Sequence, residues 1–413
     1  MKIFSLRILS LTSILIYLGS SSLYSQESFN DFLLTAFEDI NLQQFDAQMN
    51  FLKKSNYSIP IIDRLEIRGG NNEFTKEDQQ YAFRIRPSNP WKIRRNNALF
   101  NATKKELSIH KKLQFAENLQ ERYEIALDYL LEKELAEIRE ERFNIIKQRA
   151  QILGSNQQSN LFDPKDFVEA KLDQIESLNS IEEANSSKLY LEQQIALILQ
   201  TTSFNWDNEG LISVLQIQDH STSIAQNVLP STELELIAQQ VEVAKHEVRV
   251  EKADFNIGFF QTEYFPFRDK NSDYGISVGL TIPLFKPNKN KIAERKLDEI
   301  ELQNEYFTQQ YTDSVNRILN FQYLQQMIAQ HQMLEKQIDE LDLDSAIDNI
   351  NRIEDNNPLS LLDLKEGILK LEEVRLKSSK NILEQYLEFL KAFDALGSLP
   401  LINHLSSSLA PLK

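Results

Sequence analysis

Cysteine is absent from the 413 residues of this chain. The sequence therefore offers no disulfide, no thiolate metal site, no cysteine nucleophile and no lipid-bearing N-terminal cysteine. Glycine is scarce, with 10 residues, so few tight turns can form and long helices are favoured. Basic residues number 45 against 61 acidic ones, and the net charge is -16. This balance argues against nucleic acid as a partner, because phosphate binding needs a basic surface.

Motifs for catalysis and cofactor binding are also missing. No G-x-S-x-G, P-loop or H-E-x-x-H pattern occurs. The histidines have no metal-ligand spacing, and we expect them to be surface residues of helices: His110, His220, His246, His331 and His404. The sequence thus predicts a protein that is not an enzyme and that holds no cofactor and no metal.

Long apolar runs are confined to the N-terminus. Lys2 and Arg7 precede an apolar stretch of about residues 8–18, and small residues follow. This pattern predicts a secretory signal peptide over residues 1–25, with cleavage after Ser22 or an uncleaved membrane anchor as the alternatives. No later segment approaches the ~20 apolar residues of a spanning helix. We therefore expect an exported protein without a helical route into a membrane.

The rest of the chain contains an internal duplication. YAFRIRPSNPW (81–91) aligns with YGISVGLTIPL (274–284), and FDPKDFVEAKLDQI (162–175) aligns with NNPLSLLDLKEGIL (356–369) at nearly the same offset. Each half contains a helix, a β-hairpin and a long helical hairpin. The predicted parts are a first repeat at 26–201 (β-hairpin 59–91, helical hairpin 93–201), a linker at 202–230, a second repeat at 231–397 (β-hairpin 254–285, helical hairpin 288–396) and a mobile C-terminal tail at 398–413.

The helical segments repeat apolar residues every three or four positions and lack internal proline. A helix of about 60 residues is about 90 Å long, which exceeds a compact globule and favours a coiled coil. Asp163-Pro164 and Asn357-Pro358 each supply a capping side chain followed by proline, which predicts helix starts.

The strand segments alternate between two kinds of face. In YGISVGLTIPLF (274–285), apolar residues alternate with Gly275, Ser277, Gly279 and Thr281. Strands of about 10 residues are long enough to cross a bilayer at barrel tilt. A soluble sheet that packs on one face is the alternative, because it alternates too. Four strands cannot close in lipid, so the membrane interpretation requires three copies: a mainly α chain with a trimeric 12-stranded membrane β-barrel, continued by an α-helical coiled-coil tunnel.

This interpretation assigns candidate site residues. The lipid-facing set is Phe83, Ile85, Ile276, Val278, Leu280 and Ile282, and the pore-lining set is Arg64, Arg68, Arg84, Arg86, Ser277 and Thr281. An arginine ring would favour anionic solutes, and pairing with Glu66 is the alternative. Four acids lie at the predicted turn of the second helical hairpin, where they form either a gate at the end of the helical tube or a solvated turn: Asp344, Asp348, Glu354 and Asp355.

The order of elements and two stretches resemble the TolC-type outer-membrane efflux proteins. The stretches are YGISVGLTIPLFKPNKNKIAERKLDEIELQNEY (274–306) and NNPLSLLDLKEGILKLEEVRL (356–376), the second with Ser360, Asp363 and Leu364 in an S-x-x-D-L-like pattern. This chain departs from the family in lacking glycines at 286–289 and a glycine before Ser360.

The resemblance implies a trimeric exit duct of a tripartite efflux or type I secretion system in the outer membrane of a Gram-negative bacterium. Its partners would be a periplasmic adaptor (membrane fusion) protein, an inner-membrane RND or ABC transporter, and outer-membrane lipid. A periplasmic coiled-coil adaptor or scaffold is the alternative function. An exported enzyme is a third hypothesis, which the absent motifs disfavour.

Overall fold

A computed structural model describes residues 28–54, 59–71, 79–155, 163–201, 204–206, 210–266, 273–281, 288–343, 345 and 358–412. The chain divides into two compact units. The first comprises Met1–Asp39, Ala116–Val228 and Arg317–Lys413, and the second comprises Ile40–Phe115 and Leu229–Asn316. Two long helices, α4 (Pro90–Ser155) and α8 (Lys289–Glu340), contribute residues to both units.

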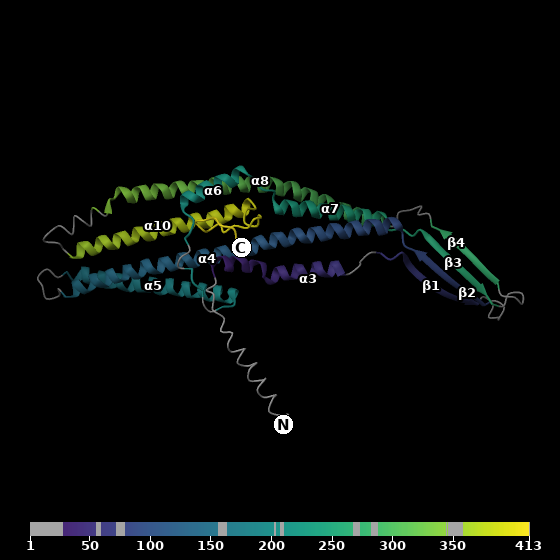
Figure 1. The fold of residues 1–413 in the computed structure, drawn as a ribbon, viewed down its shortest axis with the longest axis horizontal. Helices are drawn as coiled ribbons and strands as arrows, with labels where there is room; N and C mark the ends of the chain where they lie inside the picture. Colours follow the sequence, from purple (N-terminus) through teal and green to yellow (C-terminus); the bar gives the residue numbers. More distant parts are fainter. Residues whose placement is uncertain are drawn as a thin grey trace, which may run out of the picture. The chain divides into compact units, whose positions relative to one another are not determined.

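The second unit holds a four-stranded antiparallel sheet in the order β1-β2-β3-β4 (Figure 1). Its strands are β1 (Ile62–Asn71), β2 (Gln79–Pro87), β3 (Gly258–Phe265) and β4 (Asp273–Leu280). Helices α3 (Ile40–Lys54) and α7 (Thr232–Lys252) complete this unit with the first part of α4 and of α8. The central pair β2·β3 joins the two hairpins, which are far apart in the sequence.

The junction between β2 and α4 differs from the prediction of a strand to residue 91 and a helix from 93. β2 ends at Pro87, and α4 begins at Pro90 because the Asn89 side chain accepts a hydrogen bond from the Trp91 N–H at 3.0 Å. Proline suits the first helical position, since its missing N–H is not needed there. The Asn89 side-chain nitrogen also donates to the Ala253 carbonyl at 2.8 Å. Trp91 therefore belongs to a helix and not to a strand end.

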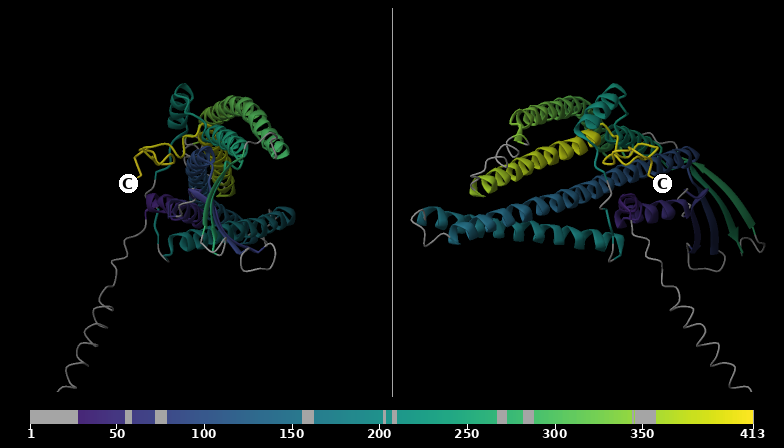
Figure 2. Two further views of the ribbon diagram at one scale, coloured as in Figure 1. Left: turned by 90° about the vertical axis from the view of Figure 1, so that its right-hand side faces the viewer. Right: turned by 60° about the vertical axis from the view of Figure 1, so that its left-hand side comes forward.

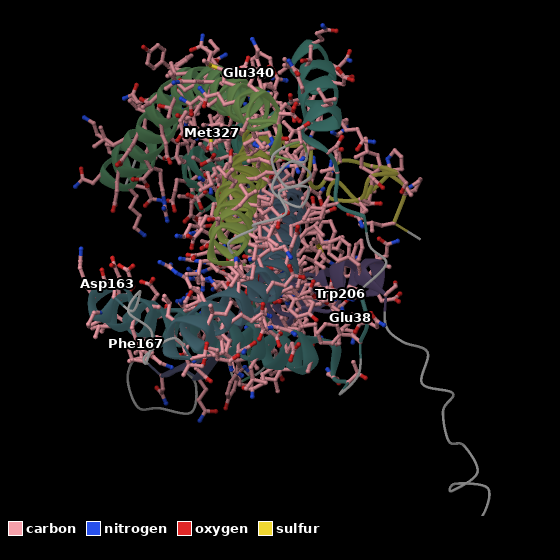
Figure 3. The ribbon with its side chains drawn as sticks, turned by 90° about the vertical axis from the view of Figure 1, so that its left-hand side faces the viewer. Glu38, Asp163, Phe167, Trp206, Met327 and Glu340 are labelled. Carbon is pink, nitrogen blue, oxygen red and sulfur yellow. The ribbon has the colours of Figure 1, made fainter. Side chains whose placement is uncertain are left out.

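The first unit consists of helices that bury aromatic side chains between them. It contains α2 (Phe29–Leu34), the 3-10 turn η1 (Thr35–Phe37), α5 (Pro164–Leu199), α6 (Val214–Gln226) and α10 (Pro358–Ala392). Antiparallel contacts join α4 to α5, as Arg139 meets Ser180 and Arg149 meets Asp173 (Figure 2). Asp163 caps α5 by accepting from the Lys165 N–H at 2.8 Å, as predicted (Figure 3).

α10 packs antiparallel to both α4 and α8. Gln120 of α4 donates to Glu388 at 3.0 Å, and Lys380 pairs with Asp128 at 2.8 Å. On the other side, Gln385 donates to Asn320 of α8 at 2.9 Å. The core beneath contains fully buried aromatic side chains, each worth about 1.5–3 kcal/mol of burial: Phe29, Phe32, Tyr123, Tyr386 and Phe389.

The structure differs from the sequence expectations in two places and adds detail to a third segment, the linker. The first repeat was expected to open with a single helix, but η1 lies between α2 and α3. The linker 202–230 contains α6, whose capping box is formed by Ser213 and Gln216, and Trp206, whose ring lies 5.4 Å from Phe29 (Figure 3). The C-terminal tail is packed rather than mobile, since Leu405 is fully buried and Leu211 forms a β-bridge with Ser406.

Among the residues that the structure describes, no helix is both long enough and apolar enough to cross a membrane.

Candidate functional site

The register of the sheet sorts its side chains into two faces. Opposed residues of antiparallel strands point to the same side, so the row Leu65, Ile85, Phe260 and Val278 lies on one face. The row Ile67, Phe83, Thr262 and Ile276 lies beside it, followed by a row of Tyr81, Tyr264 and Tyr274 with Gly69. We call this the apolar face. The opposite, charged face contains these residues: Arg64, Glu66, Arg68, Arg84, Arg86, Phe259, Gln261, Glu263, Ser277 and Gly279.

The apolar face is the exposed face of the sheet. Ile67 is 79% exposed, Ile276 is 73% exposed and Val278 is 69% exposed. On the charged face, Ala82 and Gln261 are both only 7% exposed. A soluble sheet covers its apolar face, because exposing apolar surface to water costs about 25 cal/mol per Å². The soluble-sheet alternative is therefore disfavoured by the described residues.

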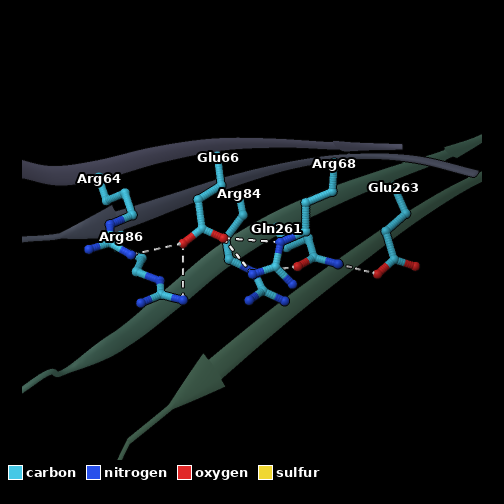
Figure 4. Close-up of polar contacts among 7 residues, drawn as sticks. All are labelled: Arg64, Glu66, Arg68, Arg84, Arg86, Gln261 and Glu263. Carbon is cyan, nitrogen blue, oxygen red and sulfur yellow. Dashed lines mark hydrogen bonds and ion pairs between the residues drawn. The ribbon is translucent and has the colours of Figure 1, made fainter. Parts of the chain in front are cut away.

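Guanidinium groups gather around one carboxylate on the charged face (Figure 4). Arg68 donates to Glu66 Oε2 at 2.5 Å, and Arg86 Nη2 lies 3.0 Å from Glu66 Oε1. Arg64 approaches the same carboxylate at 3.9 Å. Arg84 instead donates to Gln261 at 2.5 Å, and Gln261 donates to Glu263 at 2.5 Å. The cluster thus consists of two groups, Glu66 with three arginines on β1 and β2, and Arg84 with Gln261 and Glu263 on β2 and β3.

An aromatic ring of β3 contacts Arg84, and two glycines of β3 and β4 make room for that ring and for the strand pairing. The guanidinium of Arg84 lies 4.2 Å from the centroid of the Phe259 ring, which is a cation–π distance. The ring in turn covers Gly279, where a Cβ atom would lie 2.3 Å from Phe259 Cε1. Gly258 has φ +128, and a Cβ there would lie 2.0 Å from the Gly279 carbonyl oxygen. These two glycines therefore permit the close pairing of β3 and β4.

The outer strands β1 and β4 each have a neighbour on one side only within the described chain. Both edge strands also carry exposed apolar side chains on the apolar face, Leu65 and Ile67 on β1 and Ile276, Val278 and Leu280 on β4. Exposed apolar edge strands are templates for pairing with another strand. The sheet is thus open at both sides in a single copy of the chain.

The sequence-predicted residues fall on the faces that alternation assigns. Phe83, Ile276, Val278 and Leu280 are exposed on the apolar face, and Ile85 is half-buried there. Arg64, Arg68, Arg84, Arg86 and Ser277 share the charged face, and Thr281 follows β4 with its N–H donating to the Ile257 carbonyl at 3.3 Å. Pairing with Glu66, the alternative to an open arginine ring, is present for Arg64, Arg68 and Arg86. The remaining predicted residues lie outside the described residues: Ile282, Asp344, Asp348, Glu354 and Asp355.

Several site residues were missed from the sequence. Gln261 and Glu263 complete the charged face, and continued alternation through GFFQTEYF would have found them. Alternation in DFNIGFF (254–260) predicts an apolar side formed by Phe255, Ile257 and Phe259. This prediction is wrong, because the register puts Phe259 on the charged face and Phe260 on the apolar face.

Two histidines were wrongly expected on helix surfaces. His404 is 3% exposed, and its ring centroid lies 5.6 Å from that of His220. His331 is 7% exposed and lies 3.0 Å from the Ser378 hydroxyl. In the described ranges, no group of three or more His, Cys, Asp or Glu side chains is arranged to hold a metal ion.

No protein-family model and no curated protein matches this chain. Solved structures of outer-membrane channels do match. The MtrE channel of Neisseria gonorrhoeae in its open state has a TM-score of 0.65 and 11% identity, covering 92% of this chain and 90% of that one. The outer-membrane channel OprN has a TM-score of 0.65 and 11% identity over 89% and 90%. VceC, an outer-membrane protein of Vibrio cholerae, has 0.62 and 12% over 88% and 95%.

These similarities cover almost the whole of each chain at low sequence identity, so they concern the path of the backbone. They agree with a mostly helical chain that carries a small antiparallel sheet. The fold of this chain is therefore similar to that of the solved outer-membrane channels.

Proposed function

We propose that this chain is the outer-membrane exit duct of a tripartite efflux or type I secretion system. The observation that carries the proposal is the exposed apolar face of the sheet, with Ile67, Ile276 and Val278 each more than two-thirds exposed. Lipid is the solvent that such a face fits, since these apolar side chains are left exposed in water. Similar structures are outer-membrane channels, which favours the duct over a periplasmic adaptor or scaffold and over an enzyme.

Three copies of the chain form the duct in this proposal. Each copy supplies four strands, and pairing of β1 with β4 of a neighbour closes a 12-stranded barrel without open edges. The apolar face then contacts outer-membrane lipid through Phe83, Ile85, Ile276, Val278, Leu280 and Ile282. The charged face lines the lumen through Arg64, Arg68, Arg84, Arg86, Ser277 and Thr281.

The helical hairpins extend the duct into the periplasm as a coiled-coil tunnel. The inward ends of the hairpins contact a periplasmic adaptor and an inner-membrane RND or ABC transporter. The acids Asp344, Asp348, Glu354 and Asp355 form a gate there, because each inward acid becomes a ring of three in a trimer. The proposed parts of the chain are the signal peptide 1–25, the two repeats at 26–201 and 231–397, and the linker 202–230 between them.

Membrane fractionation of cells that express the full chain tests this function first. We expect the protein in the outer-membrane fraction, where it runs as a trimer on gels without heating and yields a trimer after chemical crosslinking. A soluble periplasmic monomer would contradict the duct and would support the adaptor or scaffold function.

A further inference from the structure

The charged face carries more positive charge than its own carboxylates neutralise. Strands β1 to β3 bring four arginines to this face, Arg64, Arg68, Arg84 and Arg86, and two carboxylates, Glu66 and Glu263. By register, Asp273 of β4 lies on the same face, so the net excess of the whole face is one positive charge per chain, on a protein whose net charge is -16. The cluster is therefore a local reversal of the overall charge.

The donors of the cluster also outnumber its acceptors. Glu66 is shared by Arg64, Arg68 and Arg86. Each guanidinium has five N–H donors, whereas one carboxylate offers only about four lone-pair sites, so Glu66 cannot accept from all of these donors. The Nε atom of Arg86 is buried and has no hydrogen-bond partner. A buried donor without a partner costs about 1–3 kcal/mol, so an added acceptor would stabilise this site.

The neighbouring strands add little acid to compensate. Glu263 already accepts from Gln261, which holds Arg84. On the charged face, the middle of β4 offers Gly275, Ser277 and Gly279, which carry no charge. The one described carboxylate of β4, Asp273, pairs in register with Phe265, at the end of the sheet away from Arg64 and Arg86.

We infer that Arg64, Arg68, Arg84 and Arg86 form a binding site for anionic solutes, so that the cargo of the duct bears carboxylate, phosphate or sulfonate groups. The inference rests on the proposed function, because the duct places this face in the lumen. In the proposed trimer, β4 of a second copy lies beside β1 and adds one carboxylate to this face, Asp273, together with the uncharged Gly275, Ser277 and Gly279. Guanidinium groups suit such cargo, since they bind planar and tetrahedral oxyanions through paired hydrogen bonds.

Ion selectivity of the trimer in planar lipid bilayers tests the inference. The reversal potential in a KCl gradient gives the permeability ratio of chloride to potassium, and low salt is needed because the Debye length is only ~10 Å at 0.1 M. We expect a ratio above one for the natural chain, and a decrease of roughly tenfold for the double variant Arg64→Gln/Arg68→Gln. The charge-preserving variant Arg64→Lys/Arg68→Lys should keep a ratio above one.

A matched control removes the same charge elsewhere. Lys53→Gln/Lys54→Gln changes two exposed lysines at the end of α3 and should conduct with the natural selectivity. A ratio that is equal in the natural chain and in the Arg64→Gln/Arg68→Gln variant would overturn the anion site while leaving the duct intact. A chain that is absent from the outer membrane would overturn the duct itself, and the lumenal site with it.

Thermal unfolding is a second measurement, and it does not require the periplasmic entrance of the duct to be open. Inorganic pyrophosphate should raise the thermal unfolding midpoint of the full chain in detergent, because a ligand that binds only the folded state stabilises it. The control Lys53→Gln/Lys54→Gln should show the same rise in the unfolding midpoint, and Arg64→Gln/Arg68→Gln should show none. An equal rise in Lys53→Gln/Lys54→Gln and in Arg64→Gln/Arg68→Gln, or no rise in the natural chain, would overturn the inference.

Discussion

His404 is a buried histidine whose surroundings come from three helices of the first unit. Its backbone N–H donates to the Tyr123 hydroxyl of α4 at 3.2 Å, and His220 of α6 lies beside its ring. The His220 ring in turn lies 2.5 Å from the Tyr386 hydroxyl of α10. Burial, and then the nearby His220, lower the pKa of His404 to about 3. The neutral imidazole is therefore the form that the fold accepts.

Acid should loosen this cluster. The unfolded chain binds a proton at His404 near its ordinary pKa of about 6.5, whereas the folded chain does not, so stability is complete above that value and falls as the pH drops towards 3. The slope for one such group is about 1.4 kcal/mol per pH unit. Thermal unfolding of the helices, followed by circular dichroism, should have a lower midpoint at about pH 5 than at about pH 7. His404→Gln should flatten this dependence, whereas His246→Gln on α7 should retain it.

Gly279 has no side chain, and this leaves room for the Phe259 ring. A Cβ atom there would displace the Phe259 ring and, with it, the cation–π contact of Arg84. Gly279→Ala should therefore destabilise the sheet by about 1–3 kcal/mol and lower the yield of heat-resistant trimer on unheated gels. Gly70→Ala is the matched control, because nothing lies within 4 Å of its added Cβ atom. Equal trimer yields from the two variants would contradict this role of Gly279.

At the scale of the element, strand β4 separates two environments between adjacent residues. Val278 is 69% exposed on the apolar face, and Ser277 is half-buried on the charged face. A charged group on a lipid face costs up to about 2–4 kcal/mol at the bilayer midplane, less for an acid, whereas a lumenal residue remains hydrated. Val278→Asp should reduce the amount of protein in the outer-membrane fraction, and Ser277→Asp should not. Equal amounts of the two variants in that fraction would contradict the lipid assignment of the apolar face.

At the scale of the whole molecule, closure of the barrel depends on contact between β1 of one copy and β4 of another. The chain has no cysteine, so introduced pairs report this contact without background. Variants that combine Leu65→Cys or Ile67→Cys with Ile276→Cys or Val278→Cys should form covalent dimers and trimers on oxidation, seen on boiled non-reducing gels. At least one of the four pairs should lie close enough, since bridged Cα atoms must be within about 7 Å. Monomers from all four would argue against the barrel.

The helices and the faces of the strands were accessible from the sequence because both depend on local periodicity. Three- and four-residue steps located α4, α5, α8 and α10, and two-residue alternation put Arg84 and Ile85 on opposite faces. The predicted fold class is confirmed for the helical chain with a small antiparallel sheet, and the barrel stays a prediction. The repeat boundaries also stay a prediction.

Long-range packing was not accessible in the same way. The burial of His404 and the order of the C-terminal segment depend on α4, α6 and α10, and the stretch from residue 398 onward has no period of its own. The register that puts Phe259 on the charged face depends on pairing with β2 and β4. By itself, the sequence determined the helices and the alternating strands, because neighbouring residues fix backbone periodicity. Only the tertiary structure decided that Arg86 joins Arg64 and Arg68 at Glu66, that Arg84 binds Gln261 and that His404 loses water, because those contacts join different elements of the fold.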